Sequence, residues 1–457
     1  MYDVAIIGGG PGGYAAALYA HNFGLDVALI EKESVGGTCL HRGCIPAKSW
    51  LHTAEVFTTV ASAGDFGVVA SEPRVDWDAA LARKNKNVTQ LVNGLQGLLR
   101  KRGVEVIHGF GRLALPGGVD VAHSDGVTRR VDAGAVILAT GSVPRTIPGY
   151  EIDGDRIVTS DHALDWPERP DRVAVIGAGA IGAEFASLLV DLGSEVHLFE
   201  IMDQVVPGSD PDGARVLERA LTKRGVQVRT STGVAPPQIG ADGVTVPFGD
   251  ETVTVDKVLV AVGRAPVTEG IGIEGTRIGV DRGFVEVDTA TMQTAEPGVY
   301  AVGDIVAGTP QLAHSGFAEG ISAITHIATG TAAPVDFAAI PLVVYTHPEL
   351  ASVGMTEQQA RDAGHEVEVH RHSFAGVARA IIQGDNQGIV KIVSEAGGRM
   401  LGATVAGPLA GELIHELMLA VGWEALPSEA AAFVHAHPTI AEAVGEALLS
   451  AAGRSLH

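Results

Sequence analysis

Residues 3–31 and 172–200 repeat one pattern without a gap at a constant offset of 169, and this repeat constrains the fold more than any other feature. Each copy starts with an apolar run, Val4–Ile7 or Val173–Ile176, of the kind found in parallel strands buried on both faces. A glycine turn, a segment with helical character and a second apolar run that ends in Glu follow. Two βαβ units of this kind predict an α/β fold.

The glycines of the two turns coincide under the same offset: Gly8, Gly10 and Gly13 in the first copy, and Gly177, Gly179 and Gly182 in the second. In a dinucleotide-binding turn the first glycine makes the tight turn, and the second lets the backbone approach the pyrophosphate at the helix N-terminus. The acid that ends the unit, Glu31 or Glu200, bonds a ribose 2′-hydroxyl and repels a 2′-phosphate. Residues 201–207 contain no Lys or Arg, so the sequence predicts two dinucleotide sites, with NAD favoured over NADP at the second.

Composition excludes several classes of protein. The chain has 457 residues, which suggests about three domains, and its net charge of −22 argues against binding to nucleic acid or to an anionic membrane surface. No apolar run reaches the roughly 18–20 residues of a membrane span, and the N-terminus has the pattern of a buried strand rather than a secretory signal. Two cysteines in the whole chain exclude a disulfide-stapled secreted fold, so we expect a cytoplasmic protein in a reducing compartment.

The two cysteines, Cys39 and Cys44, lie close together in GGTCLHRGCIPAK (36–48). They could be buried free thiols, a zinc site or a redox disulfide, and zinc is the poorest of these interpretations because a second pair of ligands is missing. Residues five apart in a regular helix have Cα atoms roughly 8–9 Å apart, whereas a disulfide needs less than about 7 Å. A bonded pair therefore requires an irregular turn, for which Gly43 is placed. Cys44 would then start a helix with Lys48 one turn on, where a thiolate is stabilised.

The place of these thiols in the chain indicates which dinucleotide each unit binds. Cys39 follows Glu31 by only eight residues, so the thiols must lie near the dinucleotide of the first unit. A dithiol exchanges two electrons readily with a flavin. The sequence thus favours FAD in the first unit and NAD in the second.

Further motifs extend along nearly the whole chain: GGGPGGY (8–14), ATGSVP (139–144), GAGAIGAE (177–184), VGRAP (262–266), VYAVGDI (299–305), QLAH (311–314), THPELASVG (346–354) and HAHPTIAEAVGEA (435–447). With them, the sequence resembles the flavin-dependent pyridine nucleotide–disulfide oxidoreductases, most closely the members that oxidise dihydrolipoamide. The cysteine segment and the last motif are highly specific, whereas the others are shared across the family. The resemblance implies two Rossmann-like dinucleotide-binding domains, a C-terminal α+β dimerisation domain and no metal.

The resemblance also implies cofactor contacts beyond the two glycine turns and their acids. Those to FAD are Thr38, Lys48, Gly111, Thr140, Gly141, Ser142, Asp304, Leu312, Ala313 and His314, and those to NAD include Glu184 and Gly263. Asp304 would hold the ribityl chain of the flavin. Lys48 would lie beside the flavin and pair with Glu184.

The C-terminal motif implies the acid–base chemistry. His437 would accept a proton from a substrate thiol, and Glu442 would orient its imidazole. The substrate thiolate would attack Cys39, and closure to the oxidised substrate would leave Cys44 as a thiolate against the flavin, from which electrons pass to NAD. In the family this His comes from the partner subunit, which implies a homodimer. The implied substrate is dihydrolipoamide carried by the acyltransferase of a 2-oxoacid dehydrogenase complex or by the glycine cleavage carrier.

Two other histidine segments have a structural interpretation. His435 lies close to His437 but is not followed by Pro-Thr. His415-Glu416 lacks the second His of a zinc-protease helix, so we interpret it as ordinary helix.

The order of the motifs predicts four segments. Residues 1–145 form the first part of the FAD domain, 146–264 the NAD domain, 265–335 the second part of the FAD domain, and 336–457 the interface domain. The FAD domain is therefore split, and the chain returns to it near Asp304.

Three alternatives remain open at this point. A related disulfide reductase would act on mycothione or glutathione. A flavin-only diaphorase or quinone reductase would need no thiols. A subunit docked in a larger assembly without catalysis would need neither the two cysteines nor His437.

Overall fold

The computed structural model describes residues 1–456, and the chain packs into two compact units. The first contains Met1–Ser49, Leu81–Arg145 and Arg264–Phe337, and the second contains residues 50–80, 146–263 and those from 338 onward. The chain thus leaves the first unit at Arg145 and returns to it at Arg264.

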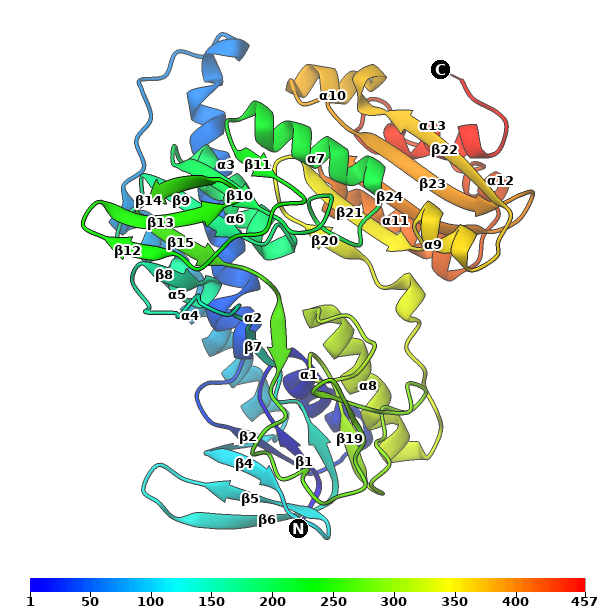
Figure 1. Ribbon diagram of the computed structural model, residues 1–457. Coiled ribbons are helices and arrows are strands. Elements are labelled where there is room, and N and C mark those ends of the chain that lie inside the picture. Colours follow the sequence, from blue (N-terminus) through cyan, green and yellow to red (C-terminus); the bar gives the residue numbers. More distant parts are fainter. Residues whose placement is uncertain (457) are drawn as a thin grey trace. The chain divides into compact units, whose positions relative to one another are not determined.

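The first unit is built on a sheet with the strand order β3-β2-β1-β6-β5-β4, with β19 also paired to β6 (Figure 1). Its strands are β1 (Tyr2–Ile7), β2 (Val27–Glu31), β3 (Glu105–His108), β4 (Phe110–Leu113), β5 (Gly118–Ala122), β6 (Thr128–Leu138) and β19 (Val299–Ala301). Strands β3, β2, β1, β6 and β19 run parallel, whereas β4, β5 and β6 pair antiparallel. The late strand β19 therefore completes a sheet that the first 138 residues began.

Helices α1 (Pro11–Ala20) and α8 (Ala313–Thr329) of this unit approach each other through glycine. A Cβ on Gly320 would lie 2.7 Å from the carbonyl oxygen of Gly12, so no side chain fits at that point. Close approach of backbones is the usual reason for a glycine inside a helix. The contact fixes α8, and with it the segment that leads into this helix, on the glycine turn.

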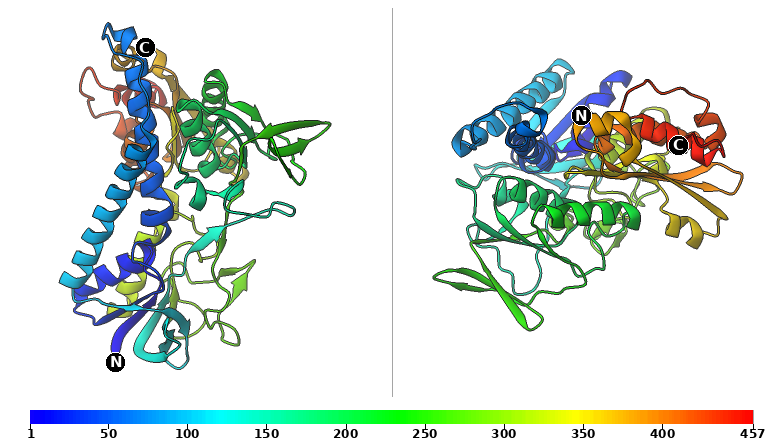
Figure 2. Two further views of the ribbon diagram at one scale, coloured as in Figure 1. Left: turned by 90° about the vertical axis from the view of Figure 1, so that its left-hand side faces the viewer. Right: turned by 90° about the horizontal axis from the view of Figure 1, so that it is seen from above.

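The second unit repeats the parallel design in the order β11-β10-β9-β15-β8. Its strands are β8 (Ile157–Thr159), β9 (Arg172–Ile176), β10 (Glu195–Phe199), β11 (Gln227–Arg229) and β15 (Lys257–Val260), with helix α6 (Ala180–Asp191) after β9. In the first unit Ile6 is paired with Leu29, and here Val175 is paired with Leu198, which is the same register under the offset of 169. A small antiparallel sheet of β12 (Gln238–Gly240), β13 (Gly243–Phe248) and β14 (Glu251–Val255) projects beside it, green in Figure 2.

Residues 50–80 pack within the second unit through two tryptophans. Trp50 Nε1 donates to the carbonyl oxygen of Leu164 at 3.1 Å, and Trp77 Nε1 donates to that of Trp166 at 2.8 Å. The Trp50 and Trp77 rings stack with centroids 4.3 Å apart. These residues belong to α3 (Cys44–Ala61) and α4 (Trp77–Lys101), two helices whose other ends contribute to the first unit.

The C-terminal part of the second unit is a five-stranded antiparallel sheet in the order β20-β21-β24-β23-β22 (Figure 1). Its strands are β20 (Leu342–Val344), β21 (Glu349–Gly354), β22 (Val367–Ser373), β23 (Ile389–Glu395) and β24 (Met400–Gly407). Its helices are α9 (Glu357–Asp362), α10 (Ala378–Gln383), α11 (Ala410–Gly422), α12 (Pro427–Ala430) and α13 (Glu442–Ala451). Helix α7 (Pro211–Lys223), which follows β10, packs on this sheet at Gly213, where a Cβ would lie 2.6 Å from Leu350 Cδ1.

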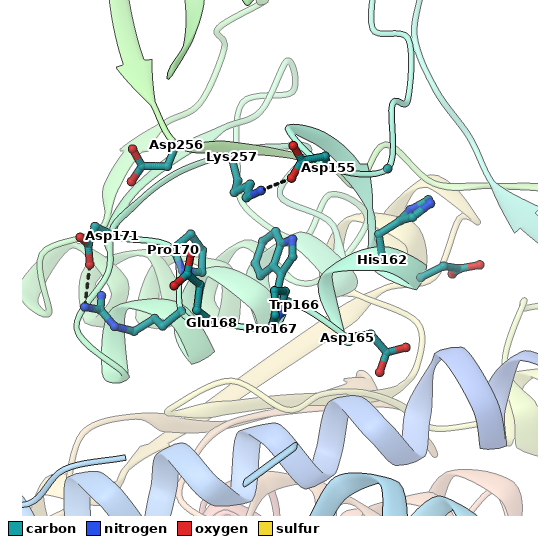
Figure 3. A pocket seen from close by; sticks show the side chains of 13 residues that line it. Asp155, His162, Asp165, Trp166, Pro167, Glu168, Pro170, Asp171, Asp256 and Lys257 are labelled. Atoms are coloured by element: carbon teal, nitrogen blue, oxygen red, sulfur yellow. Dashed lines mark hydrogen bonds and ion pairs between the residues drawn. The ribbon is translucent and has the colours of Figure 1, made fainter. Parts of the chain in front are cut away.

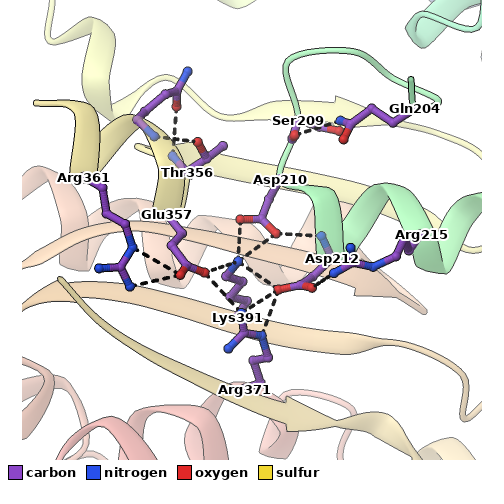
Figure 4. A network of polar contacts seen from close by, with 11 residues as sticks. Gln204, Ser209, Asp210, Asp212, Arg215, Thr356, Glu357, Arg361, Arg371 and Lys391 are labelled. Carbon is purple, nitrogen blue, oxygen red and sulfur yellow. Dashed lines mark hydrogen bonds and ion pairs between the residues drawn. The ribbon is translucent and has the colours of Figure 1, made fainter. Parts of the chain in front are cut away.

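A buried lysine joins α7 to this sheet (Figure 4). Lys391 Nζ on β23 lies 2.8 Å from Asp210 Oδ2, 2.9 Å from Asp212 Oδ2 and 3.0 Å from Glu357 Oε2, and the Lys391 side chain is only 2% exposed. Burial would lower the pKa of Lys391, but the three carboxylates raise it above its ordinary value. Arg371 adds a second cation to the cluster by donating to Asp212 at 2.8 Å.

We expect Lys391→Met to lower the free energy of unfolding by about 3–5 kcal/mol, because it leaves the buried carboxylate of Asp210 without its cation. Urea denaturation measures this. Arg361→Met is the matched control, because Arg361 pairs with the same Glu357 at 3.0 Å but is 49% exposed. The control should cost about 1 kcal/mol or less. Equal losses of unfolding free energy in the two variants would show that the buried lysine stabilises the fold no more than the exposed arginine.

No helix within residues 1–456 combines the length and apolarity needed to cross a bilayer. In the same residues, no group of three or more His, Cys, Asp and Glu side chains is arranged to hold a metal ion.

Candidate active site

The first glycine turn, directly after β1, admits no side chains at two of its predicted positions. Gly8 has φ +107°, and a Cβ there would lie 2.2 Å from the carbonyl oxygen of Ala139. A Cβ on Gly13 would lie 1.9 Å from the carbonyl oxygen of Gly8. Gly10 differs, because its Cβ would meet nothing nearer than Gly37 Cα at 3.9 Å. The middle glycine thus faces open space, which is where a pyrophosphate approaches the backbone.

The second turn, after β9, has the same geometry. Gly177 has φ +97°, and a Cβ there would lie 2.5 Å from the carbonyl oxygen of Ala261. A Cβ on Gly182 would lie 1.8 Å from the carbonyl oxygen of Gly177, whereas a Cβ on Gly179 would meet nothing within 4 Å. Both turns therefore leave room at the middle glycine, next to the start of a helix, where a phosphate binds.

The two acids are held in matching positions. Glu31 Oε2 accepts a hydrogen bond from the N–H of Gly9, and Glu200 Oε2 accepts one from the N–H of Ala178, both at 2.7 Å. Each carboxylate also accepts from the N–H of the residue two positions further on, at 2.8 and 2.9 Å. These bonds orient the carboxylates on the glycine turns, and each oxygen retains a lone pair for a ribose hydroxyl. The residues present at both turns therefore fit a dinucleotide.

Ser142 and Asp304, two further predicted FAD contacts, follow the carboxyl ends of the parallel strands β6 and β19, where ligands bind in sheets of this type. Ser142 follows β6 and donates to Asp304 Oδ2 at 2.5 Å, just after β19. Arg264 donates to Ser142 Oγ at 2.7 Å and to Thr38 Oγ1 at 3.5 Å. Four separate segments of the first unit meet in this cluster. The sequence does not predict a role for Arg264, although this residue lies in the motif VGRAP (262–266).

A second residue missed by the sequence is Glu319 on α8, which is fully buried. It accepts hydrogen bonds from the N–H of Gly303 at 2.5 Å and from Ser315 Oγ at 2.9 Å. Burial raises the pKa of this carboxyl. Glu319 thus fixes the turn that presents Asp304. No sequence motif in α8 predicts this role.

The cysteines lie on either side of a break between two helices. Cys39 belongs to α2 (Gly37–Arg42), Gly43 has the unusual dihedrals φ −144° and ψ −111°, and Cys44 begins α3. The irregular turn predicted at Gly43 is confirmed. Both residues are thiols in the structure, Cys39 partly buried and Cys44 exposed.

The environment distinguishes the two thiols. A hydrogen bond with the Cys44 side chain, together with burial, raises the pKa of the Cys39 thiol, and the nearby Lys48 ammonium partly opposes this. Burial and then the charges of the two cysteines raise the pKa of Tyr14 to about 12, so a protonated phenol lies beside them. Tyr14 ends the motif GGGPGGY but was not predicted as a site residue.

The other residues predicted to contact FAD or NAD lie at several positions in the two units. Gly111 lies in β4, where its Cβ would come within 3.0 Å of Ile30 Cγ2, so packing explains this glycine. Leu312 caps the N-terminus of α8, with Ala313 and His314 in its first turn. In the second unit, Gly263 follows β15 with φ +104°. Buried Glu184 on α6 accepts a hydrogen bond from the N–H of Tyr345 at 3.0 Å.

His437 and Glu442 form the predicted pair. His437 Nδ1 lies 2.8 Å from Glu442 Oε1, and the N–H of Thr439 donates to the other carboxylate oxygen at 2.9 Å. These two hydrogen bonds lower the pKa of Glu442. The His437 side chain is 72% exposed, which leaves its Nε2 available to a substrate.

A cavity of about 810 Å³ in the second unit lies elsewhere (Figure 3). Its walls include Trp166 and two ion pairs, Lys257 with Asp155 at 2.5 Å and Arg169 with Asp171 at 2.8 Å. These residues stand at or before the amino ends of β8, β9 and β15, at the opposite edge from the glycine turn. Dinucleotides bind at the carboxyl ends, so this cavity is not the dinucleotide site.

Comparison with known proteins agrees with this geometry. Residues 2–320 match the family described as pyridine nucleotide-disulphide oxidoreductase, and residues 340–448 match the dimerisation domain of the same family. The chain is 39% identical to the dihydrolipoyl dehydrogenase of Bacillus subtilis, over all of this chain and 99% of that one. It is 41% identical to that of Thermus scotoductus, over all of this chain and 98% of the relative.

A solved structure, that of LpdA from Mycobacterium tuberculosis, superposes with a TM-score of 0.90 at 30% identity and covers 98% of this chain and 99% of that one. The sequence match and the fold thus extend over both units. The chain therefore belongs to the pyridine nucleotide–disulphide oxidoreductases and is a flavoprotein enzyme that uses FAD and NAD.

Proposed function

We propose that the chain oxidises protein-bound dihydrolipoamide to lipoamide, with a Cys39–Cys44 disulfide as the first electron acceptor and NAD as the last. The observation that carries the proposal is the placement of the two thiols across the helix break at Gly43, with Lys48 one turn on. The similarity to dihydrolipoyl dehydrogenases over the full length supports the substrate class.

In this proposal His437 acts as the base. Its Nδ1 is bonded to Glu442, so Nε2 takes the proton from one substrate thiol. The substrate thiolate attacks Cys39 Sγ and forms a mixed disulfide, and Cys44 leaves as a thiolate. The second substrate thiol then attacks the mixed disulfide and releases Cys39. The substrate ends as a cyclic disulfide, and the enzyme holds the two electrons as a dithiol.

The two dinucleotide sites serve the rest of the cycle. A bound FAD would supply two-electron redox chemistry between the dithiol and NAD. Gly10, Glu31 and Asp304 would hold FAD in the first unit, and Gly179 and Glu200 would hold NAD in the second. Lys48, at the start of α3, stabilises the thiolate of Cys44.

We further propose that the enzyme is a cytoplasmic homodimer in which each His437 serves the cysteines of the other subunit. The match of residues 340–448 to a dimerisation domain supports the dimer. The partner would be the lipoyl-bearing acyltransferase of a 2-oxoacid dehydrogenase complex, or the glycine cleavage carrier.

Turnover of dihydrolipoamide with NAD, compared with turnover of mycothione or glutathione with NADPH, tests the function. We expect the first pair to be the efficient one. Efficient reduction of mycothione or glutathione, without oxidation of dihydrolipoamide, would replace this proposal with the related disulfide reductase.

Glu200→Gln tests the dinucleotide preference. A neutral amide has one acceptor oxygen where the carboxylate uses two for backbone N–H groups, and it no longer repels a 2′-phosphate. We expect the KM for NAD to rise about 10-fold, worth about 1.4 kcal/mol, and the preference for NAD over NADP to shrink. Steady-state kinetics with both dinucleotides measures this, and an unchanged preference would contradict the role of Glu200.

A further inference from the structure

The loop between α12 and α13 carries two histidines, and each is paired with a glutamate of a different helix. His437 pairs with Glu442 at the start of α13. His435 Nε2 lies 2.9 Å from Glu416 Oε1 on α11. The exposures are opposite, because the His435 side chain is 14% exposed and that of His437 is 72% exposed. One histidine is thus anchored in the fold, and the other, two residues on, is presented to solvent.

The His435 ring is also held from its other side. A Cβ on Gly445 would lie 2.5 Å from His435 Nδ1, so the ring rests on the backbone of α13, three residues after Glu442. No other residue type fits there while the ring stays in place. His435 therefore fastens the loop to α11 through Glu416 and to α13 through Gly445.

The same loop has a local turn that does not depend on His435. Thr439 Oγ1 donates to the carbonyl oxygen of Ala436 at 2.8 Å, and the N–H of Thr439 bonds Glu442. This turn sets the direction of His437 relative to Glu442. These two hydrogen bonds do not hold the loop against the neighbouring helices. The contacts of His435 with α11 and α13 do so.

The charges around His435 favour the anchored state. The hydrogen bond to Glu416 raises the pKa of His435, burial opposes this, and the charges of Glu416 and Glu442 raise it further. A protonated ring makes a charge-assisted bond to Glu416, which is stronger than a neutral one. The charge of His435 also contributes to lowering the pKa of Glu442, so the two pairs are linked electrostatically as well as through the backbone.

We propose that His435, held by Glu416 and Gly445, is a positioning residue for His437 and determines how the base is presented to the thiol substrate. The inference rests on the proposed function, because it assumes that His437 is the base of that reaction. The pair His435–Glu416 is not itself in the reaction path, since His435 is largely buried and its two nitrogens face Glu416 and the backbone of α13.

The test compares the two half-reactions of the FAD-loaded enzyme in Glu416→Ala and Gly445→Ala. The first removes the partner of His435, and the second pushes the ring from its place. Small misplacements of a catalytic group cost roughly 10-fold to 100-fold in rate. We expect a loss of roughly 10-fold in reduction of the enzyme by dihydrolipoamide, with the KM for NAD, reduction by NADH and the melting temperature unchanged.

Two further variants separate positioning from a general effect. Glu416→Gln keeps a hydrogen-bond acceptor for His435, so it should restore most of the rate. His415→Ala changes the preceding exposed residue of α11 and should leave both half-reactions as in the parent chain.

Equal losses in both half-reactions, or no loss with dihydrolipoamide, would overturn the inference. Failure of the unmodified enzyme to oxidise dihydrolipoamide at all would instead overturn the proposed function. The two failures are therefore distinguishable in the same experiment.

Discussion

Cys44→Ser is expected to abolish oxidation of dihydrolipoamide, with a loss of roughly 1,000-fold or more, equivalent to about 4 kcal/mol of activation free energy. A hydroxyl in place of the thiol cannot form the disulfide that accepts electrons from the substrate, so the first step of the proposed cycle has no acceptor. Steady-state turnover with dihydrolipoamide and NAD measures the loss.

The same variant should still reduce dyes with NADH, because flavin and NAD suffice for that side reaction. Retained dye reduction shows that the variant folds and binds both cofactors. His52→Ala, two turns further along α3 and 59% exposed, is the matched control and should leave lipoamide turnover intact. If Cys44→Ser keeps its lipoamide turnover, the non-catalytic subunit becomes the better interpretation. If dye reduction depends entirely on Cys39, the expected side reaction is wrong.

His437→Gln should lower lipoamide oxidation by about 10²–10⁴-fold, the usual contribution of a general base. Glutamine fills similar space and can contact Glu442, but it cannot take a proton from the substrate thiol. Dye reduction by NADH should again be unchanged, since it needs no base for a thiol. A loss below tenfold would indicate that another group removes the proton.

The two inactive variants together test whether the site is shared between subunits. If His437 serves the partner's cysteines, a mixed dimer of Cys44→Ser and His437→Gln chains has one intact site. Random mixing should then restore about a quarter of the normal activity, because half of the dimers are mixed and each has one of its two sites. If each subunit uses its own histidine, every site in the mixture lacks one group, and no activity returns.

Much of the site could be predicted because its requirements are local. The glycine turns need positive φ and close backbone contacts within a few residues, and the same contacts occur at Gly8 and Gly177. The break at Gly43 follows from helix geometry over five positions, and His437 meets Glu442 across the first turn of α13. Patterns of this length are visible in a sequence.

The residues that hold the site together were harder to find. The sequence predicts ordinary helix at Glu416, and this residue does lie in α11, but its carboxylate pairs with His435, 19 positions away. Arg264 reaches Ser142 across 122 positions, and Lys391 reaches Asp210 across 181. The residues of these pairs are of types that are common on helix surfaces and at strand ends. No neighbouring sequence pattern therefore indicates which residues pair.

The sequence by itself predicted the two dinucleotide units from spacing and residue type. Its resemblance to a known family implied a redox role for the two cysteines and a role as base for His437. Only the tertiary structure decided which buried charges meet, that residues 50–80 pack with the second unit, and that the His435 ring is mostly buried while that of His437 is exposed. The physical reason is that a buried polar group must find a partner. Which partner it finds depends on how elements far apart in the chain pack, and local patterns do not specify that packing.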